Sequence, residues 1–264
     1  MQTKVNVKIL KSKTFAESEA FKKLRTNIQF SGKNIKAIAF TSTYPGEGKT
    51  EISFRIANSL ADMGKKTLYL DVDLRNSNFL SRNVIDLKGE LKGFVHCLVG
   101  ENTLDEVIVQ TQNPNLDFIP IGAYPPNPSE LLAQETYNEL IEELKQKYDY
   151  VIIDTPPAGY VVDGVISASA ADGVIFVVSS GSVSTKNAKQ TIRELDNAGC
   201  KVMGCVLNKV NDKDDSRYGY SYRGSYGSYG YRYAYGRGYT RGFDDPKASK
   251  KPFWKILTSK FNKK

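Results

Sequence analysis

Short apolar runs recur along the chain before Asn211 and alternate with stretches of helical periodicity. The runs are rich in β-branched or aromatic residues and span Ile35 to Thr41, Thr67 to Asp71, Leu116 to Ile121, Tyr150 to Asp154, Val174 to Val178 and, more weakly, Val202 to Leu207. Continuous apolar strands separated by helices are typical of a parallel sheet that is covered on both faces. The pattern therefore predicts an α/β fold with a doubly wound, mostly parallel sheet.

Two helices can be placed beside these strands. Residues 50–63 follow the first strand and carry apolar side chains at helical spacing, namely Ile52, Ile56, Leu60 and Met63, so one face of this helix packs on the sheet. Residues 14–30 form a second helix, with Thr14 as its cap and Glu17 three residues further on. Because this helix precedes the first strand, it is an extra N-terminal element.

Composition and charge change near Asn211. The whole chain has a net charge of +8, but from Arg217 onward 12 Lys or Arg stand against only Asp244 and Asp245, which leaves −2 for residues 1–216. We expect a folded domain over residues 1–211, a disordered tyrosine-rich tail over 212–245 and a basic tail over 246–264. A nearly neutral folded part argues against a nucleic-acid-binding core.

The cysteines and the N-terminal sequence indicate the cellular compartment in which we expect the protein. Cys97, Cys200 and Cys205 show neither a paired CxxC spacing nor the dense, even usage of a disulfide scaffold, which suits a reducing cytoplasm. The start MQTKVNVKIL lacks a signal-peptide core, and there is no run of 18 apolar residues. We expect any membrane contact to be peripheral, for instance through the lysines around Phe253 and Trp254 in the basic tail.

The strongest local motif is Thr43-Tyr-Pro-Gly-Glu-Gly-Lys-Thr50, which lies between the first strand and its helix. That context is the one a phosphate-binding P-loop requires. Gly46 and Gly48 let successive backbone N–H groups face a phosphate, Lys49 reaches the β and γ phosphates, and the Thr50 hydroxyl binds Mg²⁺. The strict pattern begins with Gly where this loop has Thr43, so a simple tight turn is the alternative.

Acidic residues end two of the predicted strands. Asp71 and Asp73 follow the second strand and Asp154 ends the fourth, and in α/β sheets ligands bind beyond the carboxyl ends of the strands. Mg²⁺ takes hard oxygen ligands and few protein groups, which Thr50 and Asp154 would supply. Each carboxylate alone could equally be a solvated strand end. Tyr69, inside the second strand, is interpreted as a core residue, and the lone His96 is left out of the site.

The P-loop, LYLDVDLR and YVIIDTPP together resemble the bacterial tyrosine kinases of capsular and extracellular polysaccharide synthesis, of the kind whose transmembrane adaptor is a separate chain. Three further stretches are similar to that family. They are the helix Glu19 to Phe30, the proline-rich loop Tyr124 to Leu132 and the tyrosine-rich end. The resemblance spans nearly all of residues 15 to 239.

The resemblance implies a P-loop NTPase fold and the cofactors ATP and Mg²⁺. It implies that Asp71 accepts the tyrosine proton and that Asp73 and Asp154 organise the metal, with Thr50 and Asp71 also within the metal set. The nucleotide contacts implied are Gly46, Glu47, Gly48, Lys49, Thr50, Glu51 and, at the adenine edge, Asn208.

The resemblance also implies modification and assembly. The expected phosphoacceptors are the tail tyrosines Tyr218, Tyr220, Tyr222, Tyr226, Tyr229, Tyr231, Tyr233, Tyr235 and Tyr239. Glu19, Lys22 and Arg25 match a helix motif linked to ring-shaped self-association, with lysine where the family has arginine. The implied partners are a membrane adaptor of the polysaccharide co-polymerase type, a tyrosine phosphatase and other copies of the chain, at the inner face of the plasma membrane.

Two alternatives remain. A partitioning or septum-positioning ATPase shares the sheet and the aspartate motifs, but carries a signature lysine where this chain has Tyr44. The repeated YG and RG pairs could instead form a base-stacking RNA-binding segment, although such a segment usually accompanies a nucleic-acid fold.

Overall fold

The computed structural model describes residues 3–8, 12, 14–77, 79–84 and 91–210. The chain divides into two units, Met1–Lys11 with Ala20–Tyr220 and Ser12–Glu19 with Ser221–Lys264. The tyrosine cluster and the basic tail lie outside the described residues, so the predictions made for them stay predictions. Of the second unit the structure describes residue 12 and residues 14–19, which include the start of one helix.

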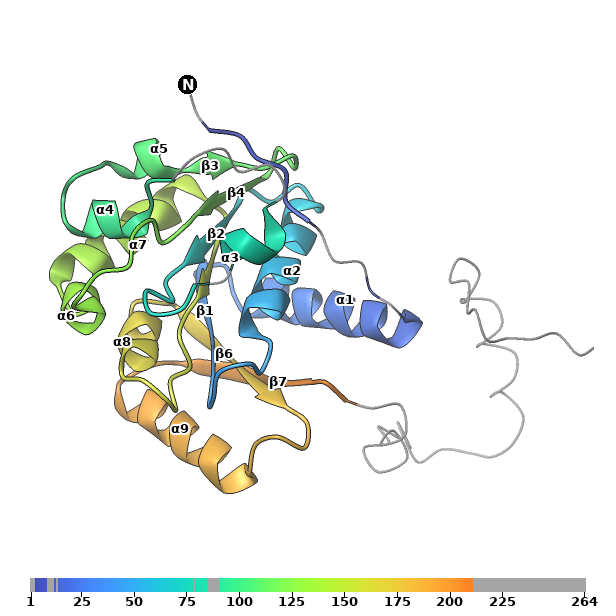
Figure 1. Cartoon of the computed structure of the whole chain (residues 1–264). Helices are drawn as coiled ribbons and strands as arrows, with labels where there is room; N and C mark the ends of the chain where they lie inside the picture. The colour runs from blue at the N-terminus through green and yellow to red at the C-terminus, as the bar shows by residue number, and fades with distance from the viewer. Residues whose placement is uncertain (1–2, 9–11, 13, 78, 85–90, 211–264) are drawn as a thin grey trace, which may run out of the picture. The chain divides into compact units, whose positions relative to one another are not determined.

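One twisted sheet forms the centre of the first unit (Figure 1). Its strand order is β3-β4-β2-β5-β1-β6-β7, and every pairing is parallel except that of β3 with β4. The strands are β1 Ala37–Ser42, β2 Thr67–Asp71, β3 Val109–Gln110, β4 Leu116–Ile119, β5 Tyr150–Asp154, β6 Gly173–Ser179 and β7 Val202–Asn208. The predicted doubly wound α/β fold is confirmed.

The predicted strands agree with the observed ones to within two residues at each end. β4 stops at Ile119 instead of Ile121 because Pro120 has no N–H to donate to the ladder. The sequence analysis missed β3, which is two residues long and antiparallel. A strand that short has no periodicity to detect.

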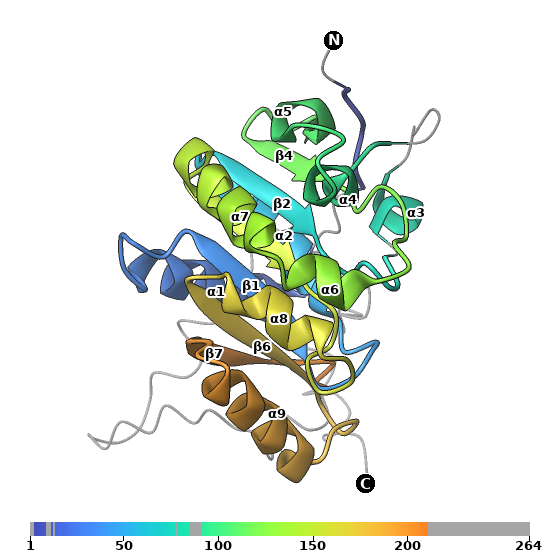
Figure 2. The same cartoon turned by 90° about the vertical axis from the view of Figure 1, so that its left-hand side faces the viewer.

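Six helices of the described chain cover one face of the sheet (Figure 2). They are α4 Phe94–Leu98, α5 Leu104–Val107, α6 Pro128–Leu132, α7 Glu135–Lys147, α8 Asp163–Ser169 and α9 Thr185–Asn197. Their apolar sides pack on alternate strand residues such as Leu68, Leu70 and Ile153. Alternate residues of a strand face opposite sides, so the remaining strand residues form a second core.

That second core lies under α1 Phe15–Phe30, α2 Lys49–Ala61 and α3 Phe79–Asn83. Four rings meet at its centre, from Phe54, Tyr69, Phe79 and Phe118, with neighbouring centroids 4.5–5.5 Å apart. Such packing of rings adds to the stabilisation from burial. Because Phe79 is completely buried there, it fixes α3 beside the end of β2.

The N-terminal helix begins as predicted, since Thr14 Oγ1 accepts the Glu17 N–H at 3.1 Å. Further along α1, the Arg55 guanidinium lies 3.7 Å from the centroid of the Phe21 ring and Arg25 Nη1 donates to Ser59 Oγ at 2.9 Å. These contacts join α1 to α2. α2 itself starts at Lys49 and ends at Ala61, close to the predicted 50–63.

Residues 3–8 form an N-terminal strap that the sequence analysis did not foresee. Its Val5 N–H donates to Gln110 O at 3.0 Å and its Lys8 N–H donates to Asn83 O at 2.6 Å. Val5 and Val7 are buried. The strap therefore links β3 to α3, at the side of the sheet where α3 approaches the end of β2.

Among the residues that the structure describes, none of the helices combines the length and apolarity needed to cross a membrane.

Candidate active site

The loop between β1 and α2 has the backbone of a phosphate cradle. Gly46 and Gly48 adopt φ values of 80° and 99°, a region that residues with a side chain rarely adopt. α2 begins directly after Gly48, so its first N–H groups and its positive dipole end face the loop. The motif from Thr43 to Thr50 therefore lies between a strand and a helix, as the sequence predicted.

The side chain of Glu47 holds this loop in place through two hydrogen bonds. Its carboxylate accepts the Tyr44 N–H through Oε1 at 2.6 Å and the Ser179 N–H through Oε2 at 2.9 Å, and the residue is buried. Glu47 does not line the cavity described below. The Glu47 side chain connects the loop to the end of β6. Only the backbone of Glu47 is therefore available to a nucleotide.

A pair of residues at the end of β7 holds the loop from the other side. Asn208 Nδ2 donates to Glu47 O at 2.8 Å, and Lys209 Nζ donates to Gly46 O at 2.7 Å. We call Asn208 and Lys209 the loop latch. A Cβ on Gly48 would lie 2.2 Å from Asn208 Nδ2, so the latch fits closely only over a glycine.

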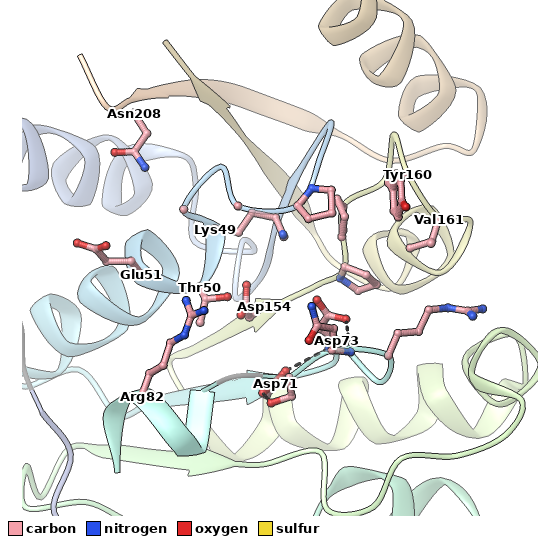
Figure 3. Close-up of a pocket in the computed structure, with 18 of the residues that line it drawn as sticks. Lys49, Thr50, Glu51, Asp71, Asp73, Arg82, Asp154, Tyr160, Val161 and Asn208 are labelled. Atoms are coloured by element: carbon pink, nitrogen blue, oxygen red, sulfur yellow. Dashed lines mark hydrogen bonds between the residues drawn. The ribbon is translucent and has the colours of Figure 1, made fainter. Parts of the chain in front are cut away.

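A cavity of about 600 Å³ opens between the loop and the strand ends (Figure 3). This volume lies in the range of small-molecule sites. All the predicted nucleotide, metal and catalytic residues except Glu47 line it, namely Gly46, Gly48, Lys49, Thr50, Glu51, Asp71, Asp73, Asp154 and Asn208. The fold thus brings together, from β1, β2, β5 and β7, the residues that the motifs placed apart in the sequence.

Two carboxylates of neighbouring strands face this cavity side by side. Asp71 and Asp154 are register partners at the ends of β2 and β5, and both are buried. Asp71 Oδ1 accepts the Asp73 N–H at 3.1 Å, while its Oδ2 accepts the Ser77 hydroxyl. Asp154 Oδ2 accepts the Tyr69 hydroxyl at 3.0 Å. Asp154 Oδ1 is buried and has no hydrogen-bond partner in the described part of the chain.

Burial and mutual repulsion act on the acidity of these groups. Burial, and then the charge of Asp154, raise the pKa of Asp71 well above its usual value. Burial raises the pKa of Asp154 to about 6, against the opposing effect of the Lys49 ammonium. Asp73 has a raised pKa from burial, again opposed by Lys49. A cavity in which buried carboxylates lack enough positive charge favours a bound cation.

The donor set fits Mg²⁺. No cluster of three or more His, Cys, Asp or Glu within the described residues is arranged to hold a metal by itself, but Mg²⁺ needs only one or two carboxylates when phosphates and waters complete its shell. Thr50 and Asp154, whose Oδ1 has no hydrogen-bond partner among the described residues, line the same cavity. These two groups are where a metal would be held.

Two arginines that line the cavity, and a buried aspartate that pairs with one of them, escaped the sequence analysis. Arg75 forms a two-pronged ion pair with the buried Asp163, with Nε–Oδ2 at 2.5 Å and Nη2–Oδ1 at 3.2 Å. Asp163 Oδ1 also accepts the hydroxyl of Ser129, which lies in α6, at 2.5 Å. Arg82 extends from α3 towards Thr50 (Figure 3). Arg75 follows the aspartates in LDVDLR and could have been suspected, whereas nothing near Asp163 or Arg82 in the sequence marks them.

Comparisons with known proteins identify the family of this chain. The family model of the AAA domain matches residues 35–202. The tyrosine-protein kinase CpsD of Streptococcus agalactiae is 42% identical over 214 residues, which cover 81% of this chain and 90% of CpsD.

Among solved structures, the VpsO kinase domain matches with a TM-score of 0.68 and 31% identity, over 74% of this chain and 94% of that one. The septum site-determining protein MinD of Pyrococcus horikoshii, solved with Mg-ADP, matches less well, with a TM-score of 0.55 and 25% identity over 65% and 69% of the two chains. The partitioning or septum-positioning ATPase is therefore a more distant relative. The chain belongs to the family of bacterial tyrosine-protein kinases.

Proposed function

We propose that this chain uses Mg-ATP to phosphorylate tyrosines, those of its own tail included, and that it thereby regulates capsular or extracellular polysaccharide synthesis. The observation that carries the proposal is one shared cavity. Lys49 lines it together with the buried Asp71 and Asp154, and the charge of Lys49 acts on the Asp154 carboxylate. Phosphoryl transfer requires mainly positioning and charge neutralisation, and this group supplies both.

Each residue has a separate part in the transfer. Lys49 and the loop N–H groups hold the β and γ phosphates, and Asn208 lies at the adenine edge. Thr50 and Asp154 would hold Mg²⁺, which when bound neutralises phosphate charge. Asp71 takes the proton from the tyrosine hydroxyl. Its raised pKa makes Asp71 a stronger base than an ordinary carboxylate, and its bonds to Ser77 and to the Asp73 N–H fix its orientation.

Mass spectrometry of the full chain after incubation with Mg-ATP tests the proposal. We expect phosphate on tyrosines of the segment from Tyr218 to Tyr239, and no incorporation into that segment when its nine tyrosines are replaced by Phe. ATP hydrolysis without phosphotyrosine would favour the partitioning-type ATPase. RNA retention without either activity would favour the nucleic-acid module.

Gly48→Ala should weaken ATP binding at least about tenfold, because the added Cβ displaces Asn208 and strains a backbone held at φ 99°. Isothermal titration measures the effect. Gly64→Ala is the matched control, since Gly64 has φ 78° but an added Cβ would meet no atom within 4 Å. The control should lose stability and keep its affinity for ATP. Equal affinities in the Gly48 variant and the native chain would contradict the role of the latch.

The family resemblance supports three further parts of the proposal. A transmembrane adaptor and a tyrosine phosphatase act on this chain, and copies of it assemble, at the inner face of the plasma membrane. Of the helix residues Glu19, Lys22 and Arg25, Arg25 donates to Ser59 Oγ within the chain. Light scattering of Lys22→Glu against the native chain tests assembly.

Sedimentation with anionic vesicles, with and without residues 246–264, tests the membrane contact.

A further inference from the structure

Tyr69 has a partner that its place in the core did not suggest. It lies in the middle of β2 and is completely buried, with its ring 4.5 Å from that of Phe79 and 5.3 Å from that of Phe54 between centroids. Its hydroxyl reaches past this cluster and donates to Asp154 Oδ2 at 3.0 Å. The aromatic cluster is therefore hydrogen-bonded, through Tyr69, to a carboxylate that lines the nucleotide cavity.

The two oxygens of Asp154 are consequently unequal. Oδ2 is occupied by the Tyr69 hydroxyl, whereas Oδ1 is buried and has no hydrogen-bond partner among the described residues. A buried carboxylate oxygen without a partner is rare, because its desolvation is not compensated. At a cavity that also contains Lys49 and Thr50, an unsatisfied oxygen of this kind points to a ligand that the protein alone does not supply.

We propose that Tyr69 is a positioning residue, whose hydroxyl fixes the carboxylate of Asp154 so that Oδ1 is presented to the Mg²⁺ that accompanies the nucleotide. This inference rests on the metal assignment within the proposed function. Partners that orient a metal-binding carboxylate govern metal affinity, and their loss typically lowers it 10- to 100-fold. Tyr69 itself does not line the cavity.

An ordinary structural role makes a different prediction, and Tyr137 shows what that role looks like. Tyr137 is also almost completely buried, on the other face of the sheet, and its hydroxyl donates to the backbone oxygen of Ser167 at 2.8 Å. A buried phenol usually finds such an acceptor. Removing the hydroxyl of Tyr137 costs one buried hydrogen bond but leaves the cavity unchanged, so Tyr137→Phe is the matched control for Tyr69→Phe.

Thermal unfolding of the full chain with ADP, at increasing Mg²⁺ concentration, tests the inference without measuring kinase activity. We expect Tyr69→Phe to respond to ADP alone as the native chain does, but to need at least about tenfold more Mg²⁺ for half of the additional stabilisation. Tyr137→Phe should unfold at a lower temperature and keep the native Mg²⁺ requirement. Binding of Mn²⁺ followed by electron paramagnetic resonance, in the presence of ADP, should show the same difference.

The outcome that overturns the inference is a native Mg²⁺ requirement in Tyr69→Phe, or an equal increase in both variants. Absence of any Mg²⁺ effect in the native chain also overturns it. If instead Tyr69→Phe shows the expected loss of metal affinity while the native chain forms no phosphotyrosine, the positioning role holds and the proposed kinase activity fails.

Discussion

Lys49→Ala is expected to lower the rate of phosphotyrosine formation by at least about a thousandfold, the scale on which cations and donors aimed at a transferring group act. Lys49 is nearly buried, with 7% of its surface exposed, and it opposes the raised pKa values of both Asp73 and Asp154. Its loss removes the proposed phosphate contact and leaves these carboxylates less compensated. The variant should therefore also unfold at a lower temperature than the native chain when no nucleotide is present.

Incorporation of labelled phosphate into tyrosine measures the first effect and calorimetry the second. Lys36→Ala is a suitable control, because Lys36 Nζ bonds to Lys145 O at the opposite end of the strands and is also partly buried. The control should retain the native rate. A Lys49 variant that phosphorylates tyrosine at more than a few per cent of the native rate would remove this lysine from the mechanism.

Asp154→Asn should stop phosphotyrosine formation and, without Mg²⁺, make the protein more stable near pH 7. The pKa of Asp154 is raised by burial to about 6, against about 3.9 in an unfolded chain. Between these values the folded protein keeps a proton that the unfolded chain has released. Stability from this group is thus fully present below about pH 4, falls as pH rises through about 6 and stays lost above it. The difference amounts to roughly 3 kcal/mol, which corresponds to about 6 to 12 °C in Tm.

Calorimetry of both proteins from pH 4 to pH 8 tests this prediction, and the gap in Tm should widen up to about pH 6 and then remain constant. Asp172→Asn gives the opposite sign. Burial raises the pKa of Asp172, but hydrogen bonds from Lys145 and from the Ala37 and Lys36 N–H groups outweigh burial and leave its pKa below the usual value. That variant should be destabilised at neutral pH. A lower Tm for Asp154→Asn at pH 7 would show that Asp154 is compensated by groups of the protein alone.

The parts of this molecule that the sequence predicted are those whose signals are local. Parallel strands that are buried on both faces appear in the sequence as continuous apolar runs. The first and last residues of β2 and β5 could therefore be predicted correctly from these runs. The glycine loop and the aspartates at strand ends follow from the same logic, because the carboxyl ends of parallel strands meet at one edge of the sheet. Family resemblance then assigned roles that geometry by itself leaves open.

The parts that the sequence did not reveal depend on contacts between distant segments. Glu47 lies within the loop motif, yet its carboxylate bonds to Ser179, more than a hundred residues away. Tyr69 has the pattern of a core strand residue, and only the register of β2 with β5 brings its hydroxyl to Asp154. The N-terminal strap pairs with Gln110 and Asn83 through backbone groups, which carry no sequence signal at all.

The loop latch has a consequence for how the nucleotide site opens. Asn208 is the last residue of β7 and Lys209 follows it. Among the strands that the structure describes, β7 is an edge strand that pairs with β6 alone. Its residues are half-buried or exposed, unlike those of the fully buried β1 and β2. Edge strands with little buried surface open with less free energy than the centre of a sheet, and amide hydrogen exchange reports such local openings. Each time the end of β7 detaches, Gly46 and Glu47 lose their hydrogen bonds to the latch. The local stability of the phosphate cradle then depends on that of the edge strand β7, and exchange at the loop amides should follow exchange along β7.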